Sequence, residues 1–135
     1  MSLFKVFDIA GSGMSAQSVR LNTTSSNLAN AQTSASTPDE VYKAKHPVFS
    51  AIMDQYNNSS VGVKVDSIVE SNDTPQKLYQ PGHPNADDDG YIYTSNVNIV
   101  EEMANMISAS RSYQSNVEVL NTTKQLMLRT LQLGQ

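Results

Sequence analysis

The sequence predicts a mainly α-helical protein with a small β insert. All five prolines fall between Pro38 and Pro84, so the strongest helix breakers are confined to the middle of the 135-residue chain. Apolar residues recur at helical spacing on both sides of that middle part. We therefore expect an N-terminal helix within residues 1–37, a β and loop insert over residues 38–95, and a C-terminal helix within residues 96–135. The two helices should pair as a coiled coil, which is antiparallel if the insert simply reverses the chain, although its length permits either sense.

The C-terminal segment carries the clearest helical pattern. Positions alternate at intervals of four and three residues from Ile99 to Leu131, and most of them are apolar or large, as in the seam of a coiled coil. Asn98 and Glu101 have the spacing of a helix cap followed by an acidic residue at the third helical position. A helix from about residue 98 to 132 would be ~50 Å long. Such a helix cannot fold onto itself in a short chain, so it needs a partner.

The N-terminal helix offers a narrower and more polar stripe. Large apolar residues recur every seventh position from Phe7 to Leu28, but Ala, Gln and Thr fill the positions between them. Gly11 and Gly13 weaken the helix, because each Gly costs about 1 kcal/mol relative to Ala. The C-terminal helix also has apolar residues outside its seam, at Ile107, Val119, Leu126, Leu128 and Leu133. We therefore expect an uncovered apolar face and a protein that completes its core by polymerising.

The middle segment predicts short strands. Residues 61–66 alternate apolar with small or polar side chains, which is typical of a half-buried strand. Residues 91–93 favour a second strand and residues 42–49 a third, which Pro47 restricts to a sheet edge. Residues 55–60 predict a loop. Three short strands bury little surface, so the insert should pack on the helical pair.

The composition excludes several classes of protein. A net charge of −4 argues against a nucleic-acid binder, which needs a basic surface. The absence of cysteine excludes a disulfide framework and thiolate chemistry. No apolar run is long enough for a secretory signal or a membrane span, so we expect neither Sec-dependent export nor a direct membrane span. Ser, Asn, Thr and Gln supply 48 residues, which lets helix faces form directional hydrogen bonds while burying few charges.

No pattern indicates an active site or a cofactor. Both histidines precede a proline, and no nucleophile or orienting acid is placed by the sequence beside either of them. The glycine-rich motifs of nucleotide-binding proteins and the serine motif of hydrolases are absent. We therefore expect no enzymatic activity, no cofactor and no metal.

The acidic run from Asn85 to Gly90 is the one candidate for a metal ligand set. It places oxygen-bearing side chains at positions 1, 3 and 5 of an EF-hand loop and glycine at position 6. Position 12 is Asn96 where a glutamate should close the calcium shell, and Pro81 and Pro84 exclude an entering helix. A solvated turn before a strand is the simpler interpretation, and a degenerate calcium-binding module remains an alternative.

Patterns at both ends of the chain resemble those of bacterial flagellar rod and hook proteins. The N-terminal patterns are Gly13-Met14-x-Ala16-x-x-x-Arg20-Leu21 and Asn27-Leu28-Ala29-Asn30-x-x-Thr33. The C-terminal patterns are Asn96-Val97-Asn98, Glu101-Glu102-Met103-Ala104-Asn105-Met106-Ile107 and Ala109-x-Arg111-x-Tyr113-x-x-Asn116-Val117. The short chain and the loop Pro81-Gly82-His83-Pro84-x-Ala86 with Asp89-Gly90-Tyr91 are similar to the proximal-rod members of that family.

The resemblance implies a structural subunit of the flagellar proximal rod. Such a subunit polymerises through its terminal helices into a helical drive shaft that crosses the periplasm and transmits torque. The implied partners are copies of itself, other rod and adaptor proteins, and the flagellar type III export apparatus, which needs no Sec signal. The implied location is the rod of the basal body in the periplasmic space. A soluble coiled-coil adaptor with a β cap, folding as a closed helical pair, is the alternative that the residues themselves leave open.

The residues expected in the assembly interface lie on the two helices and combine apolar seam positions with the patterns above. On the N-terminal helix they are Phe7, Met14, Arg20, Leu21, Asn27, Leu28, Ala29 and Asn30. On the C-terminal helix they are Asn98, Met103, Met106, Arg111, Tyr113, Asn116, Val117, Leu120, Met127 and Leu131. The amides among them should fix subunit register, because a buried amide left without a partner costs about 1–3 kcal/mol.

Overall fold

The computed structural model describes residues 3–53 and 60–133 and consists of two long helices, a two-stranded ribbon and a small three-stranded sheet. The helices are α1 (Leu3–Asn30) and α2 (Ile99–Leu133). The ribbon pairs β2 (Lys45–Met53) with β3 (Ser60–Glu70). The sheet has the order β1 (Ser34–Ala35), β5 (Tyr91–Thr94) and β4 (Gln76–Tyr79), and all the strand pairs are antiparallel. The prediction of a mainly helical chain with a β insert is thus confirmed.

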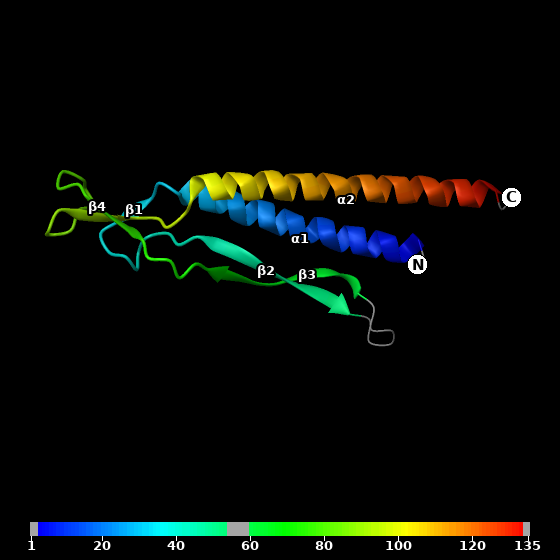
Figure 1. Ribbon diagram of the computed structural model, residues 1–135, viewed down its shortest axis with the longest axis horizontal. Helices are drawn as coiled ribbons and strands as arrows, with labels where there is room; N and C mark the ends of the chain where they lie inside the picture. Colours follow the sequence, from blue (N-terminus) through cyan, green and yellow to red (C-terminus); the bar gives the residue numbers. More distant parts are fainter. Residues whose placement is uncertain (1–2, 54–59, 134–135) are drawn as a thin grey trace.

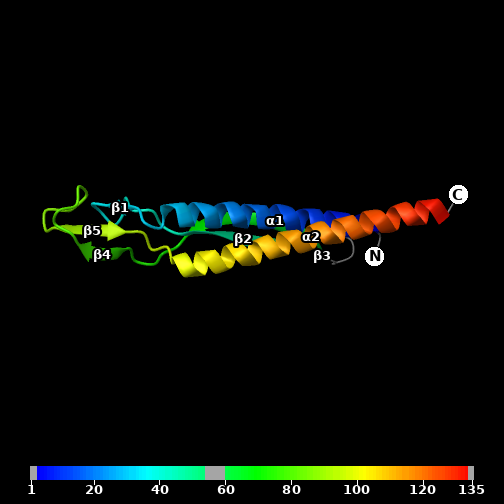
Figure 2. The ribbon, with the colours of Figure 1, turned by 90° about the horizontal axis from the view of Figure 1, so that it is seen from above.

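The long elements lie along one direction. Figure 1 shows α1 and α2 side by side, with the β2–β3 ribbon running beside α1 and the three-stranded sheet beyond one end of the helices. Figures 1 and 2 both place the start of α1 and the end of α2 towards the end of the molecule opposite to that sheet. The result is an elongated molecule, and among the described residues both helices carry many exposed side chains.

The helix boundaries follow from local hydrogen bonds. The side chain of Asn98 accepts hydrogen bonds from the backbone N–H groups of Val100 (3.1 Å) and Glu101 (3.3 Å), so the predicted cap is confirmed. At the same end of the pair, α1 stops at Asn30, where the hydroxyl of Thr33 donates to the carbonyl oxygen of Asn30 at 2.7 Å. The backbone N–H of Thr33 also donates to that oxygen, at 3.2 Å, and the chain then turns into β1. The N-terminal helix is therefore shorter than the proline-free segment 1–37.

The strands extend beyond those predicted. The expected strands over 61–66 and 91–93 lie within β3 and β5, and the expected strand over 42–49 overlaps β2, in which Pro47 lies on a two-stranded ribbon as its edge preference requires. The expected loop over 55–60 falls outside the described residues apart from Ser60, which begins β3. Strands β1 and β4 were not predicted, since one has two residues and all four side chains of the other are exposed.

Small side chains form most of the helix interior. Ala10 and Ala16 of α1 and Ala109 of α2 are buried, and so are the threonines Thr24 and Thr123. The seam expected on α2 is only partly correct, because Ile99 and Met103, at its beginning, are exposed. A seven-residue repeat drifts by about 20° per heptad on a straight helix, so positions that face the partner at one end turn away at the other. The side chains of Glu102 and Ala109 take the buried positions instead.

Asn27 is fully buried and fixes the position of the insert. Its amide nitrogen donates to the carbonyl oxygen of Lys45 at 2.8 Å, and its oxygen accepts from the Lys45 N–H and the Tyr42 hydroxyl, both at 2.9 Å. One side chain of α1 therefore satisfies both backbone polar groups of the first residue of β2. Because buried polar groups are costly unless paired, these bonds hold the chain to one geometry where it enters the ribbon.

A second polar contact docks the ribbon on α1 near its start. The hydroxyl of Ser12 donates to the carbonyl oxygen of Ile9 at 2.8 Å and accepts from the backbone N–H of Val63 at 3.1 Å. Gly62 allows this approach, because a Cβ atom there would lie 2.6 Å from the Ser12 hydroxyl oxygen. The absence of a side chain at Gly62 therefore makes room for the hydrogen bond between Ser12 and Val63.

The two helices approach each other closely at Gly13. A Cβ atom at this position would lie 2.9 Å from the side-chain nitrogen of Asn116 on α2, whereas a Cβ atom at Gly11 would meet nothing within 4 Å. The helix continues through both glycines despite their low propensity. Gly13 therefore permits close packing of α2, and Gly11 lies in open space.

Replacement of Asn27 should destabilise the isolated protein. In Asn27→Ala the backbone groups of Lys45 lose their side-chain partners, and we expect a loss of about 2–4 kcal/mol in the free energy of unfolding, measured by urea denaturation. Asn22→Ala is the matched control, because Asn22 is exposed on the same helix and should change stability by less than about 0.5 kcal/mol. Equal stability of the two variants would contradict this role of Asn27.

The two helix glycines should respond differently to alanine. Gly11→Ala gains helix propensity in open space, and we expect it to raise the free energy of unfolding by about 0.5–1 kcal/mol. Gly13→Ala gains the same propensity but displaces the Asn116 side chain, so it should be at least about 1 kcal/mol less stable than Gly11→Ala. Thermal unfolding followed by circular dichroism measures the difference, and the reverse order would refute the close approach.

Candidate functional site: the uncovered apolar surface of the helices

The beginning of α2 carries an apolar stripe that no element covers. Val100, Met103 and Ile107 follow one another at helical spacing, and Val100 and Ile107 are 76% and 54% exposed. Side chains at such spacing lie on one face, so they form a continuous strip on the outside of the subunit. Contiguous exposed apolar surface of this kind marks an interaction site.

A second apolar region lies at the far end of the helical pair. Phe4 and Leu131 are 73% and 69% exposed and, with Met127 and Thr130, they line a small apolar cavity of about 180 Å³. Leu128 is also exposed there. Gly13 faces Asn116, and the side chain of Arg20 donates to that of Asn105 at 2.8 Å. Continued along both helices, this pairing brings the start of α1 near Met127, so the last turn of α2 extends beyond its partner.

The off-seam residues of α2 are exposed as the sequence predicts. Ile107, Val119, Leu126 and Leu128 all lie on the surface; the side chain of Leu133 is outside the described part of the chain. Phe4 and Val100 were not singled out from the sequence. A helical wheel that includes every apolar residue of both helices, and not only the best seven-residue seam, finds both of them.

The β2–β3 ribbon adds apolar residues that sequence reasoning missed. Its exposed large side chains are Val48, Phe49, Ile52, Met53, Ile68 and Val69. Because successive side chains of a strand point to opposite faces, the exposed neighbours Ile68 and Val69 show that apolar side chains are accessible on both faces of the ribbon, which alternation along the sequence does not reveal. The uncovered apolar surface of the subunit therefore includes part of the ribbon as well as the helices.

The residues expected in the assembly interface fall into three groups in the structure. Exposed on the helices or at the α2 cap are Ala29, Asn98, Met103, Arg111 and Leu131. Partly buried are Phe7, Met14, Arg20, Leu21, Leu28, Asn30, Met106, Tyr113, Asn116, Val117, Leu120 and Met127. Asn27 is fully buried. An assembly role for these residues stays a prediction.

Several polar members of that set make contacts within the subunit. Arg20 bonds to Asn105 across the helices, and Asn98 caps α2. The side chain of Asn30 donates to the carbonyl oxygen of Ser26 one turn earlier in α1, at 2.8 Å. The hydrogen bonds that these side chains make in the structure therefore position the helices and their ends.

The acidic run forms a turn. The side chain of Asp87 accepts hydrogen bonds from the backbone N–H groups of Asp89 (3.1 Å) and Tyr91 (2.7 Å), and Gly90 adopts a φ angle of 80°. The same carboxylate that would be a calcium ligand thus organises the approach to β5. Within residues 3–53 and 60–133, no group of three or more acidic or histidine side chains is placed to hold a metal ion.

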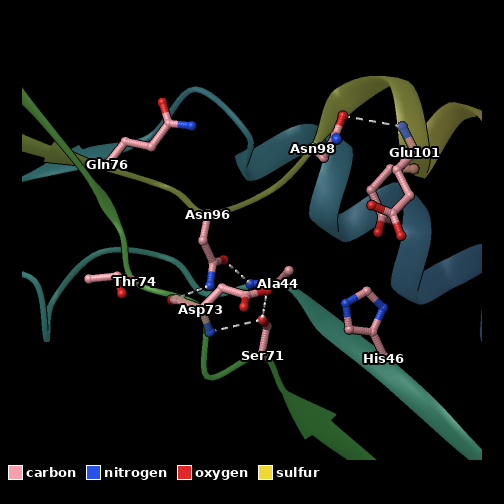
Figure 3. A pocket seen from close by; sticks show the side chains of 10 residues that line it. Ala44, His46, Ser71, Asp73, Thr74, Gln76, Asn96, Asn98 and Glu101 are labelled. Carbon is pink, nitrogen blue, oxygen red and sulfur yellow. Dashed lines mark hydrogen bonds between the residues drawn. The ribbon is translucent and has the colours of Figure 1, made fainter.

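A polar cavity of about 380 Å³ lies where the ribbon, the three-stranded sheet and the beginning of α2 meet (Figure 3). Asn96 closes one side of it, because its oxygen accepts from the N–H of Ala44 at 2.7 Å and its nitrogen donates to the carbonyl oxygen of Asp73 at 2.9 Å. His46, Glu101 and other polar residues line the remainder. The cavity has no arrangement of nucleophile, base and orienting acid among these lining residues.

Comparisons with known proteins identify the family. A family model described as "Flagella basal body rod protein" matches residues 7–34, and one described as "Flagellar basal body rod FlgEFG protein C-terminal" matches residues 88–133. The flagellar basal-body rod proteins FlgC of Yersinia enterocolitica and Salmonella typhimurium are 51% and 50% identical over 135 residues. FlgC of Buchnera aphidicola subsp. Baizongia pistaciae is 36% identical over 136 residues, and each alignment covers 100% of both proteins.

The chain therefore belongs to the flagellar basal-body rod protein family, as the terminal patterns of the sequence indicate. Within that family its full-length similarity is to the FlgC proteins. The family is structural, which confirms the prediction that the chain is not an enzyme. No helix in the described ranges is long and apolar enough to cross a membrane.

The turn at Asp87 predicts a structural effect in place of calcium binding. Asp87→Ala removes the acceptor of two backbone N–H groups, and we expect a loss of about 1–2 kcal/mol in the free energy of unfolding. Asp88→Ala is the control, because Asp88 is exposed and should be close to neutral. Calorimetry with millimolar calcium should give no binding heat for the unaltered protein; heat that is lost in Asp87→Ala would restore the calcium-module alternative.

Proposed function

We propose that this protein is a subunit of the flagellar proximal rod, polymerising through its terminal helices into a helical drive shaft that crosses the periplasm and transmits torque. The relatives that resemble this chain over its whole length are named basal-body rod proteins. The observation that carries the proposal is the uncovered apolar surface of the helices, from Val100 to Ile107 and around Phe4 and Leu131. Burial of such surface contributes a favourable term of about 25 cal/mol per Å², part of which offsets the entropy lost on association.

The helical pair supports a division of the subunit into an inner and an outer part. We propose that residues 1–37 and 96–135 form an inner helical domain as an antiparallel coiled coil, and that residues 38–95 form the insert outside it. The contacts from Arg20 to Asn105 and from Gly13 to Asn116 fit an antiparallel pairing, since the residue numbers change in opposite directions. Small interior side chains permit a close approach of the two helices.

Torque transmission in such a shaft needs many moderate contacts between subunits and no reactive group. Heterologous contacts that do not close into a ring generate a filament. Exposed members of the predicted interface, such as Met103, Arg111 and Leu131, are available to neighbours directly, and partly buried members such as Leu28 and Val117 keep part of their surface accessible. The proposed partners are copies of this chain, other rod and adaptor proteins, and the flagellar type III export apparatus that delivers the subunit to the periplasm without a Sec signal.

The exposed residues disfavour a closed soluble adaptor. A helical pair that completes its own core would cover its largest apolar side chains, whereas Phe4 and Val100 are among the most exposed residues of the two helices. Fibre-forming or assembly-dependent proteins tolerate such surface because a neighbour buries it.

Substitution of an exposed apolar residue on α2 tests the proposal. Ile107→Asp places a charge on the uncovered stripe, and we expect loss of swimming motility and of incorporation into purified basal bodies, because the neighbour would have to bury an unpaired carboxylate. The stability of the isolated subunit should change by less than about 0.5 kcal/mol, since Ile107 is exposed.

Ser108→Asp supplies the matched control, because Ser108 is exposed next to Ile107 but points away from the stripe, and it should leave motility near normal. Leu28→Asp and Val117→Asp should also abolish incorporation, but their partly buried positions mean that they affect folding as well. Normal motility and normal incorporation of Ile107→Asp into basal bodies would contradict an assembly role of this stripe.

A further inference from the structure

The polar cavity at the beginning of α2 is lined by a carboxylate that has no partner within the described part of the subunit. The side chain of Glu102 lines the cavity, and the residue is only 3% exposed. Its carboxylate forms no hydrogen bond or ion pair with any residue in the ranges 3–53 and 60–133. Glutamate is almost never buried to this degree unless it is paired. In the isolated subunit its oxygens keep contact with solvent in the cavity, so water is the partner available to them.

The cavity lining provides negative charge and acceptors but no strong cation. Asp73 and Glu101 are exposed at its rim, and His46 lies on the β2 side, as Figure 3 shows. None of the ten lining residues is a lysine or an arginine. The nearby Lys45 pairs with Glu70, at 3.5 Å, on the neighbouring strand. The positive end of the α2 backbone favours Glu102 and Glu101, but it does not supply a hydrogen-bond donor for the buried carboxylate here.

The surface beside the cavity carries both polar and apolar side chains. A neighbouring hollow of about 370 Å³ shares Gln76, Asn96 and Asn98 with the cavity and is also lined by Ile99 and Val100. A partner that covers the exposed Val100 would thus place its adjacent residues directly over the acidic cavity. The two surfaces together specify a partner residue that is basic and is flanked by apolar side chains.

We propose that this cavity receives a lysine or arginine side chain from a neighbouring subunit, which pairs with Glu102 when the rod assembles. The inference rests on the proposed rod function and adds the chemistry of one contact to it. An ammonium or guanidinium group carries three to five donors, which match the carboxylate of Glu102 and the oxygen acceptors around it. Glu102 then has a protein partner only in the assembled state, and a subunit seated in the wrong register covers the cavity without supplying a cation.

Glu102→Gln separates this role from a structural one. Glutamine keeps the shape of the side chain but removes the buried charge, so the isolated subunit should be as stable as the unaltered protein or more stable. Incorporation into basal bodies, measured by quantitative mass spectrometry of purified rods, should fall by at least about tenfold because the neighbour's cation loses its partner. Undiminished incorporation would overturn the inference, and so would a loss of subunit stability that accounts for the loss of incorporation.

Two further variants make the result specific. Glu118→Gln removes an exposed charge from the same helix outside the cavity and should incorporate normally. Glu102→Asp keeps the charge and should incorporate better than Glu102→Gln, whereas equal loss in both would show that keeping the charge does not preserve incorporation and would overturn the proposed pairing. Failure of the unaltered chain and of Glu118→Gln to enter rods would refute the rod function itself, so the two proposals are tested separately.

Discussion

The close approach of two helices through small side chains is the constraint on which the rest of the structure depends. Ala10, Ala16 and Ala109 fill the interior, and the glycine at position 13 lets the side chain of Asn116 lie against the backbone of α1. Helices that meet through such residues leave no internal room for the large apolar residues of α2. Those side chains therefore lie on the flanks and the outer face, where neighbouring molecules can cover them. One choice of interior residues thus produces both the packing of the subunit and the surface for its assembly.

Polar side chains of α1 determine how the insert lies on this pair. Asn27 holds the entry to β2 and Ser12 holds β3, at opposite ends of the ribbon. Apolar contacts alone would let a two-stranded ribbon slide along a helix, because apolar contacts have little directional preference. Hydrogen bonds to defined backbone atoms remove that freedom, and few charges are buried in the process. The abundance of uncharged polar residues in the composition is thereby explained at particular positions.

The sequence supports the prediction of elements better than the prediction of their contacts. The cap at Asn98, the two long helices and the strand at Tyr91 depend on local patterns, and all are found. The buried face of α2 was less predictable, since a seven-residue repeat and a straight helix diverge along 35 residues. The partners of Asn27 and Ser12 were not predictable, because each contact joins α1 to a strand through a single polar side chain and leaves no periodic pattern in the sequence. Glu102 has the sequence signature of an ordinary helix start, and only its burial in the structure distinguishes it from Glu101.

The order of the elements along the chain has a consequence for the timing of folding. The bond between Arg20 and Asn105 joins residues 85 positions apart, and the helix partner of α1 is the last element of the chain. Closing a loop of this length costs conformational entropy before any contact between the helices repays it, so contacts within the ribbon should form earlier. A chain that emerges from a narrow passage with its N-terminus first exposes α1 without its partner until nearly all residues have passed. The helical pair can therefore form only after nearly the whole chain has emerged, and a chain that is truncated before α2 cannot form it.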